Sequence, residues 1–196
     1  RPLLLVASLT HPHDPYAITR EFFDLYKSED IDMPGPAIPA DQLDPHSQRL
    51  RHVCAMDALP LTEQQIRTAR RAYYGEISYV DRNAGRLIKA LTDCGLRENT
   101  VVIVLADHGE MLGDKGLWYK MSFFENSARV PLIVNWPARF APRRIAAAAS
   151  LLDVTPTLVD LAGGSSAEVE TDGRSLLPHL QGGDAPDETV AEYLAE

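Results

Sequence analysis

The stretch TVVIVLADHGEMLGDKGLWYKMSFFE at residues 100–125 decides the fold class of this chain. It opens with an apolar run at residues 101–105, in which four of the five side chains are β-branched. Such a run is typical of a buried strand in a parallel sheet. Asp107 and His108 follow almost at once. Because ligands of open α/β sheets bind at the carboxyl ends of the strands, this position favours a carboxylate and an imidazole that together bind a divalent cation.

Lys120 lies further along the same stretch, among glycine and aromatic residues. A lysine is a compact positive charge that suits an anionic substrate. A metal site, a lysine and a strand end together indicate hydrolysis of a sulfate or phosphate ester. Two simpler interpretations stay open at this point. The Asp-His pair can be a turn with a helix N-cap, and Lys120 can be an exposed lysine at the start of a helix.

The longer segment DHGEMLGDKGLWYKMSFFENSARVPLIV resembles the sulfatases of the alkaline phosphatase superfamily, and most of all the choline sulfatases. Further segments are similar to parts of the same family, in the same order: LTHPHDPY at 9–16, GEISYVD at 75–81, SLLDVTPTLVDLAG at 150–163 and DGRSLLPHLQG at 172–182. The resemblance covers nearly the whole chain. It implies an α/β fold, the alkaline phosphatase-like sandwich, with a mainly parallel central sheet and helices on both faces.

The resemblance also implies a calcium-dependent hydrolase with a formylglycine nucleophile, although Mn²⁺ is an alternative metal. Carried over by motif, Asp107 and His108 are expected to be metal ligands, and Lys120 to contact the substrate sulfate. His13 matches the histidine of the family's His-x-Pro-Tyr motif, which binds sulfate and can protonate the leaving group. His11 stands outside that motif and ranks second, as a substrate-binding candidate.

The family's nucleophile motif and its early pair of aspartates do not occur in this sequence. Formylglycine is made in a motif of the C-x-P-x-R type, and neither Cys54 nor Cys94 lies in one. We therefore interpret residues 1–196 as the C-terminal-side part of a sulfatase catalytic domain, with the formylglycine in a missing N-terminal part. The chain by itself is expected to be inactive.

Composition narrows the class of protein. A length of 196 residues with 45% hydrophobic residues allows one domain with a sizeable core. The net charge of −9 argues against nucleic-acid partners, which attract positive charge. No apolar run approaches the roughly 18 residues of a membrane span, so no membrane partner is expected. Two cysteines without a disulfide-like pattern favour a reducing, cytoplasmic location.

Hydrophobic patterning predicts several elements. A strand is expected at residues 3–10 and another at 132–136, with a helix at 150–162. A capping box, Thr62-x-x-Gln65, predicts the start of a long helix with its apolar face against the sheet and its arginines mainly in solvent. Residues 28–60 are rich in proline and acidic residues without a steady period, which indicates a long surface insertion. His46, His52 and Cys54 are interpreted as structural or solvated residues.

Three hypotheses for function remain. The first is hydrolysis of choline sulfate to choline and sulfate by a full-length enzyme, expected to be a homo-oligomer, that acts on a small-molecule sulfate ester. The second is a phosphonate or phosphate ester hydrolase of the same superfamily. The third is a non-catalytic metal-binding or subunit-interface module.

Overall fold

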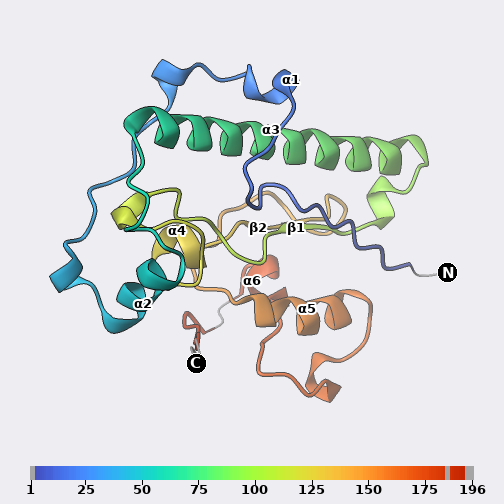
Figure 1. The fold of residues 1–196 in the computed structure, drawn as a ribbon. Coiled ribbons are helices and arrows are strands. Elements are labelled where there is room, and N and C mark those ends of the chain that lie inside the picture. Colours follow the sequence, from blue (N-terminus) through green and yellow to red (C-terminus); the bar gives the residue numbers. More distant parts are fainter. Residues whose placement is uncertain (1–2, 184–185, 193–196) are drawn as a thin grey trace. The chain divides into compact units, whose positions relative to one another are not determined.

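The computed structural model describes residues 3–183 and 186–192 (Figure 1). The chain divides into two compact units, each formed by two separate segments. Unit 1 consists of residues 1–97 and 108–131, and unit 2 of residues 98–107 and 132–196. The chain therefore leaves unit 2 and enters unit 1 at the bond between Asp107 and His108.

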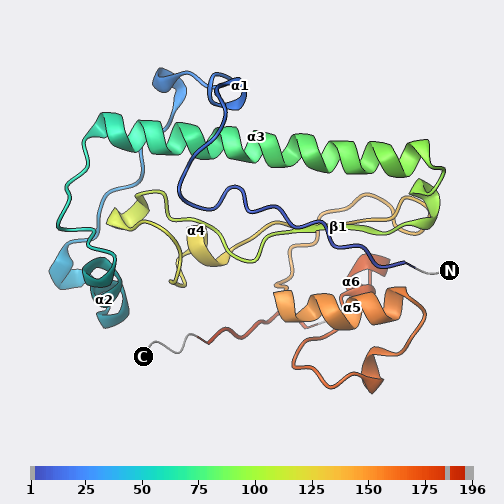
Figure 2. The same cartoon turned by 45° about the vertical axis from the view of Figure 1, so that its right-hand side comes forward.

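Unit 1 is built around the long helix α3, Glu63–Asp93, which Figures 1 and 2 show as one continuous rod. The predicted capping box begins it: the Thr62 side chain accepts from the Gln65 amide, and the Gln65 side chain accepts from the Thr62 amide at 2.8 Å. The helix ends at Asp93, with Cys94 as its C-cap, and Gly95 follows in the left-handed conformation with φ of 68°. The predicted start of this helix is confirmed.

The short helix α1, Arg20–Phe23, packs against α3 through the buried Phe22. Close approach requires Gly75, because a Cβ there would lie 3.0 Å from the Phe22 carbonyl oxygen. The guanidinium groups of Arg82 and Arg71 cover the rings of Phe22 and Phe23 at 4.1 and 3.9 Å from their centroids.

The face of α3 that is buried differs from the predicted one. The buried residues of the helix are Arg70, Ala72, Gly75 and Glu76, whereas Ile77 and Leu87 of the predicted apolar face are 44% and 45% exposed. The prediction that the arginines lie mainly in solvent is wrong for Arg70. Its guanidinium donates to the Asp32 and Leu112 carbonyls at 2.8 and 2.9 Å, and it also pairs with the Asp32 carboxylate. These bonds compensate the burial of its charge.

The remaining elements of unit 1 are short. Residues 28–60 contain the 3-10 turns η1, Ser28–Asp30, and η2, Ala40–Gln42, and the helix α2, Pro45–Val53. Beyond the unit boundary lie the turn η4, Asp114–Gly116, and the helix α4, Glu125–Ala128. The interpretation of residues 28–60 as an insertion stays a prediction, although this segment carries more helix than its composition indicates.

Unit 2 contains a two-stranded sheet formed by β1, Val102–Leu105, and β2, Leu132–Asn135. The strands run antiparallel, with Val102 opposite Asn135 and Leu105 opposite Leu132. The expectation that the first strand is buried in a parallel sheet is therefore wrong for the described residues, and Leu105 is 42% exposed. An apolar run specifies a strand but not the direction of its neighbour, which explains the error.

Helices follow the strands in unit 2. The 3-10 turn η5, Leu151–Asp153, leads into α5, Val154–Leu161, and Gly163 follows with φ of 88°. These elements confirm the predicted helix at 150–162. The unit also contains η6, Ser166–Glu168, and α6, Leu177–Gln181. A third turn, η3, Arg97–Asn99, spans the boundary between the units.

The strand expected at residues 3–10 and the mainly parallel sheet are both missing from the described residues. Residues 3–10 form no strand, and Leu3 is 84% exposed, because a strand needs a partner to bond to and none of the described residues pairs with this segment. Arg1 and Pro2, which precede this segment, lie outside the described residues. The mainly parallel sheet of the expected sandwich is accordingly not confirmed. No helix in the part of the chain that is described has the length and apolar character of a membrane span.

Candidate functional site

Lys120, His13 and Asp14 form a charged cluster in unit 1. The Lys120 Nζ lies 2.5 Å from the His13 Nε2 and 3.5 Å from the Asp14 Oδ1. The side chains of Lys120 and Asp14 are 20% and 32% exposed, so the lysine is partly shielded from water while His13 stays more open at 41%. Two of the sequence-predicted residues, which are 107 positions apart, thus meet at one point.

The backbone at His13 decides which ring nitrogen faces the lysine. The His13 Nδ1 lies 2.8 Å from the Asp14 carbonyl oxygen, and a carbonyl oxygen can only accept, so Nδ1 carries a hydrogen. The Nε2 atom of the neutral ring is then an acceptor, and it receives a hydrogen bond from the Lys120 ammonium. His13 therefore presents Nε2 as the atom that can exchange a proton with a bound molecule.

His108 lies beside this cluster, with its ring centroid 5.8 Å from that of His13. Its Nδ1 lies 2.9 Å from the Gly109 carbonyl oxygen, so this nitrogen also carries the hydrogen. The ring of a metal-binding histidine is commonly held in this way, with one nitrogen donating to a carbonyl and the other left as the ligand atom. The orientation of His108 suits the role expected of it.

The chain after His108 is fixed by backbone contacts with the segment around α4. The amides of Gly109 and Glu110 donate to the carbonyls of Ser127 and Asn126, each at 2.7 Å. A Cβ at position 109 would lie only 2.0 Å from the Asn126 carbonyl oxygen. Glycine is therefore required next to His108, and the D-H-G order of the sequence has a steric cause.

Two phenols and one carboxyl of unit 1 are shielded from water. Burial, together with the nearby Glu110 carboxylate, raises the pKa of Tyr16 far above its ordinary value. Burial likewise raises the pKa of Tyr73 to about 12. Glu76 is fully buried, and burial raises the pKa of its carboxyl, against which the nearby His11 acts.

The other two candidate residues are His11 and Asp107. The ring of His11 is 4.9 Å from that of Tyr79 on α3, so His11 contacts this helix rather than the Lys120 amino group. Asp107 follows β1 by two residues and is the last residue of the first segment of unit 2. Asp14 was not singled out from the sequence, although it stands inside the HPHDPY motif that placed His13.

The donor set for a metal is incomplete within the described residues. Residues 3–183 and 186–192 contain no group of three or more His, Cys, Asp or Glu side chains that could hold a metal ion. The carboxylate of Asp107 is the kind of oxygen donor that a hard cation such as Ca²⁺ prefers, and His108 offers a nitrogen. The two consecutive residues fit part of a metal site, and other ligands are needed to complete it.

Comparisons with known proteins find similar sequences and structures. The sequence model of the sulfatase family matches residues 1–165. A choline-sulfatase from Rhizobium meliloti (strain 1021) is 47% identical over 199 residues, covering 100% of this chain and 39% of that protein. An arylsulfatase from Clostridium perfringens (strain 13 / Type A) is 31% identical over 166 residues, covering 83% of this chain and 34% of that protein.

Among solved structures, the phosphonate monoester hydrolase SpPMH from Silicibacter pomeroyi superposes with a TM-score of 0.80 at 29% identity. That match covers 91% of this chain and 37% of the hydrolase. The chain thus spans between about a third and two fifths of the length of these three proteins.

Proposed function

The chain belongs to the sulfatase family, and from that premise we propose that the protein hydrolyses sulfuric esters, with choline sulfate as substrate and choline and sulfate as products. The observation that carries this proposal is the cluster of Lys120, His13 and Asp14 beside His108. The 47% identity with a protein named choline-sulfatase supports the choice of substrate.

Each side chain of the cluster has a distinct part in the proposed reaction. The Lys120 ammonium binds an oxygen of the sulfate group and stabilises the negative charge that grows there during attack. The His13 Nε2 takes a proton from water and delivers it to the leaving alkoxide, which leaves as the alcohol. The Asp14 carboxylate, 3.2 Å from the His13 Nδ1, stabilises the imidazolium in between. A chain with a net charge of −9 needs such a local cation to attract an anionic ester.

The metal and the nucleophile are part of the proposal. Asp107 and His108 would hold a divalent cation, Ca²⁺ in our proposal, together with ligands from outside the described residues. When bound, this cation supplies positive charge that polarises the sulfate oxygens. The formylglycine nucleophile of the family is proposed to come from outside residues 1–196, since neither Cys54 nor Cys94 has the required neighbours.

A second candidate function is hydrolysis of phosphonate or phosphate esters. The specific observation in its favour is the likeness to SpPMH, which has a TM-score of 0.80 over 91% of this chain. Lysine, histidine and a divalent cation suit a phosphonate oxygen as well as a sulfate oxygen, so the substrate must be tested directly.

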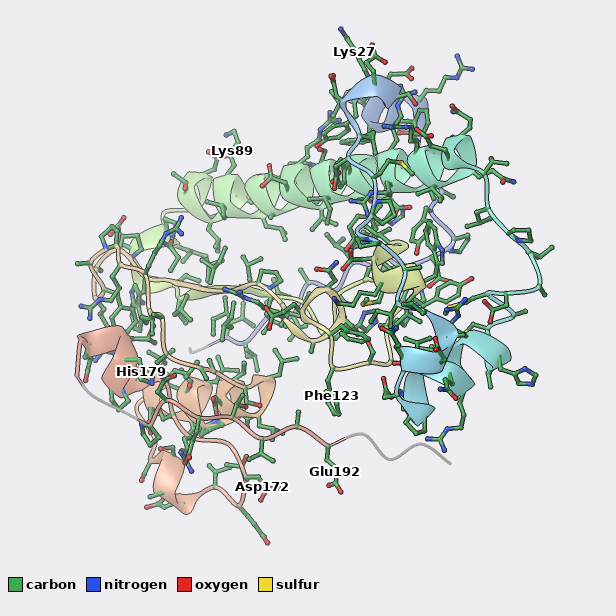
Figure 3. The ribbon with its side chains drawn as sticks, turned by 90° about the vertical axis from the view of Figure 1, so that its left-hand side faces the viewer. Lys27, Lys89, Phe123, Asp172, His179 and Glu192 are labelled. Carbon is green, nitrogen blue, oxygen red and sulfur yellow. The ribbon has the colours of Figure 1, made fainter. Side chains whose placement is uncertain are left out.

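The test compares ester hydrolysis by the complete gene product on choline sulfate and on a phenyl phosphonate monoester. We expect a kcat/KM higher for choline sulfate, and a loss of about 100-fold or more in Lys120→Ala and in His13→Ala. The matched control is Lys89→Ala, because Lys89 projects from α3 into solvent and is 74% exposed (Figure 3). Preference for the phosphonate ester would favour the second candidate, and full activity in Lys120→Ala would contradict both.

A further inference from the structure

Lys120 lies between two residues with a strained backbone. Tyr119 and Met121 each have φ of 68°, in the left-handed region that side chains larger than glycine rarely adopt. Such conformations persist only where surrounding structure holds them. The direction of the Lys120 side chain therefore depends on the contacts that hold its two neighbours.

The residue before Lys120, Tyr119, is held by a backbone hydrogen bond. The Met111 amide donates to the Tyr119 carbonyl oxygen at 2.7 Å. Met111 is fully buried, with 0% of its surface exposed, so this anchor belongs to the packed interior of unit 1.

The residue after Lys120, Met121, is held by a side chain from a distant part of the sequence. The His46 Nε2 lies 2.6 Å from the Met121 carbonyl oxygen, across 75 positions of the chain. Because a carbonyl oxygen only accepts, the His46 Nε2 carries the hydrogen and donates it. The bond is partly buried, which shields it from competing water.

His46 is itself firmly placed. It stands in the first turn of α2, where the Asp44 carboxylate caps the helix by accepting from the amides of His46 and Ser47 at 2.9 and 3.0 Å. Ser47 is only 2% exposed, so the start of α2 is packed into unit 1. The start of α2 therefore fixes the position from which the His46 imidazole contacts the Met121 carbonyl.

We propose that His46 is a positioning residue: by holding the Met121 carbonyl, it keeps the Lys120 amino group directed at His13 and Asp14, ready for the substrate anion. This inference rests on the proposed function of Lys120. It assigns residues 28–60 a part in ester hydrolysis that their composition does not indicate, through a residue that sequence patterning interprets as structural or solvated.

The test uses variants that differ in whether they can make this one bond. His46→Ala removes the donor, and His46→Gln keeps an N–H donor of similar reach. His46→Asn keeps the same amide on a side chain too short to span the gap. The control is His52→Ala, an exposed histidine on the same helix. Each is made in the complete gene product.

The first measurement is hydrogen–deuterium exchange of backbone amides in residues 117–123, which does not depend on activity. We expect exchange roughly tenfold faster in His46→Ala and His46→Asn. The rates of His46→Gln and His52→Ala are expected to stay within about threefold of wild type. Because Asn and Gln differ only in reach, this pair keeps the test decisive even if His46→Ala fails to fold. Unchanged exchange in His46→Asn would overturn the proposal.

The second measurement is a kinetic cycle with Lys120→Ala on choline sulfate. We expect kcat to fall about 10-fold to 100-fold in His46→Asn, since a small displacement of a catalytic group is costly. In the Lys120→Ala background the same change is expected to cost less than about twofold, because the residue to be positioned is gone. Effects that multiply would mean that His46 acts independently of Lys120, which overturns the proposal. A wild-type protein inactive on every ester tested would instead contradict the proposed function, while the exchange measurement still reports whether His46 holds the segment.

Discussion

Gly109 shows how tightly one residue of the candidate site is constrained. A Cβ there would lie 2.0 Å from the Asn126 carbonyl oxygen, whereas a Cβ at Gly85, in the middle of α3, would meet nothing within 4 Å. We predict that Gly109→Ala lowers the free energy of unfolding by about 1–3 kcal/mol, because the backbone beside His108 must shift.

Gly85→Ala is the matched control for that change. It is expected to raise the free energy of unfolding by about 0.5–1 kcal/mol, since alanine favours the helix and no neighbour obstructs it. Urea unfolding of the two variants measures whether the free energy of unfolding falls in Gly109→Ala and rises in Gly85→Ala. Equal stability of Gly109→Ala and wild type would contradict the steric account of the D-H-G order.

Glu76 predicts a particular dependence of stability on pH. Burial raises the pKa of its carboxyl above the ordinary value of 4.5, so the folded state holds the proton more tightly than the unfolded state does. The stability from this group is therefore complete below pH 4.5 and is lost as the pH rises through the raised pKa.

Replacing Glu76 by glutamine removes this loss. We predict that Glu76→Gln favours folding more at pH 8 than at pH 4.5, because glutamine has no carboxyl that must ionise in a buried place. The exposed Glu63→Gln, on the first turn of the same helix, is the matched control. Urea unfolding at both pH values measures the change in the free energy of unfolding. An identical change for Glu76→Gln at both pH values would contradict a raised pKa of the Glu76 carboxyl.

At the scale of elements, α3 is connected to the rest of unit 1 through Arg70. This side chain, on α3, donates hydrogen bonds to the carbonyls of Asp32 and Leu112. Leu112 precedes Lys120 in the same loop region. We predict that Arg70→Met lowers the free energy of unfolding by about 1–3 kcal/mol, because the buried Leu112 carbonyl loses its donor.

Arg86→Met serves as the comparison on the same helix. Arg86 is exposed and donates to the neighbouring Asn83 side chain at 3.2 Å, so its loss should change stability by less than about 0.5 kcal/mol. Similar losses in the two variants, measured by thermal or urea unfolding, would show that Arg70 has no special part in joining these segments.

The elements also show which kinds of structure could be predicted from sequence. The start of α3 is set by Thr62 and Gln65, three positions apart, and the end by Gly95, so both could be read locally. The direction of β1 and the absence of a strand at 3–10 depend on partners that no local pattern specifies. The burial of Arg70 depends on Asp32 and Leu112, which are 38 and 42 positions away.

The candidate site divides in the same way. Short motifs identified His13, His108 and Lys120, and the structure brings these three together. The contribution of Asp14 depends on a loop geometry, and that of His46 on a contact across 75 positions. Neither leaves a pattern in a single sequence, so both could be found only in three dimensions.

At the scale of the whole molecule, activity is expected to require more than residues 1–196. We predict that this polypeptide, expressed by itself, hydrolyses no sulfate ester, because neither cysteine lies in a formylglycine motif. The measurement is sulfate release from choline sulfate by the purified polypeptide and by the complete gene product under the same conditions. Turnover by residues 1–196 that vanishes in Asp107→Ala would refute the prediction and would mean that the chain carries its own nucleophile.

The shielded phenols of Tyr16 and Tyr73 give the whole molecule an optical signature. The chain has seven tyrosines, and phenolate absorbs in the near ultraviolet where phenol does not. As alkali is added, these two phenols are expected to stay un-ionised beyond pH 10, since the pKa of Tyr73 is about 12 and that of Tyr16 is raised further. They should ionise only when unfolding admits water, so a forward titration would show a late, abrupt rise in absorbance that a titration in denaturant lacks. The near-ultraviolet absorbance would then report whether the structure that shields Tyr16 and Tyr73 is intact, without any substrate.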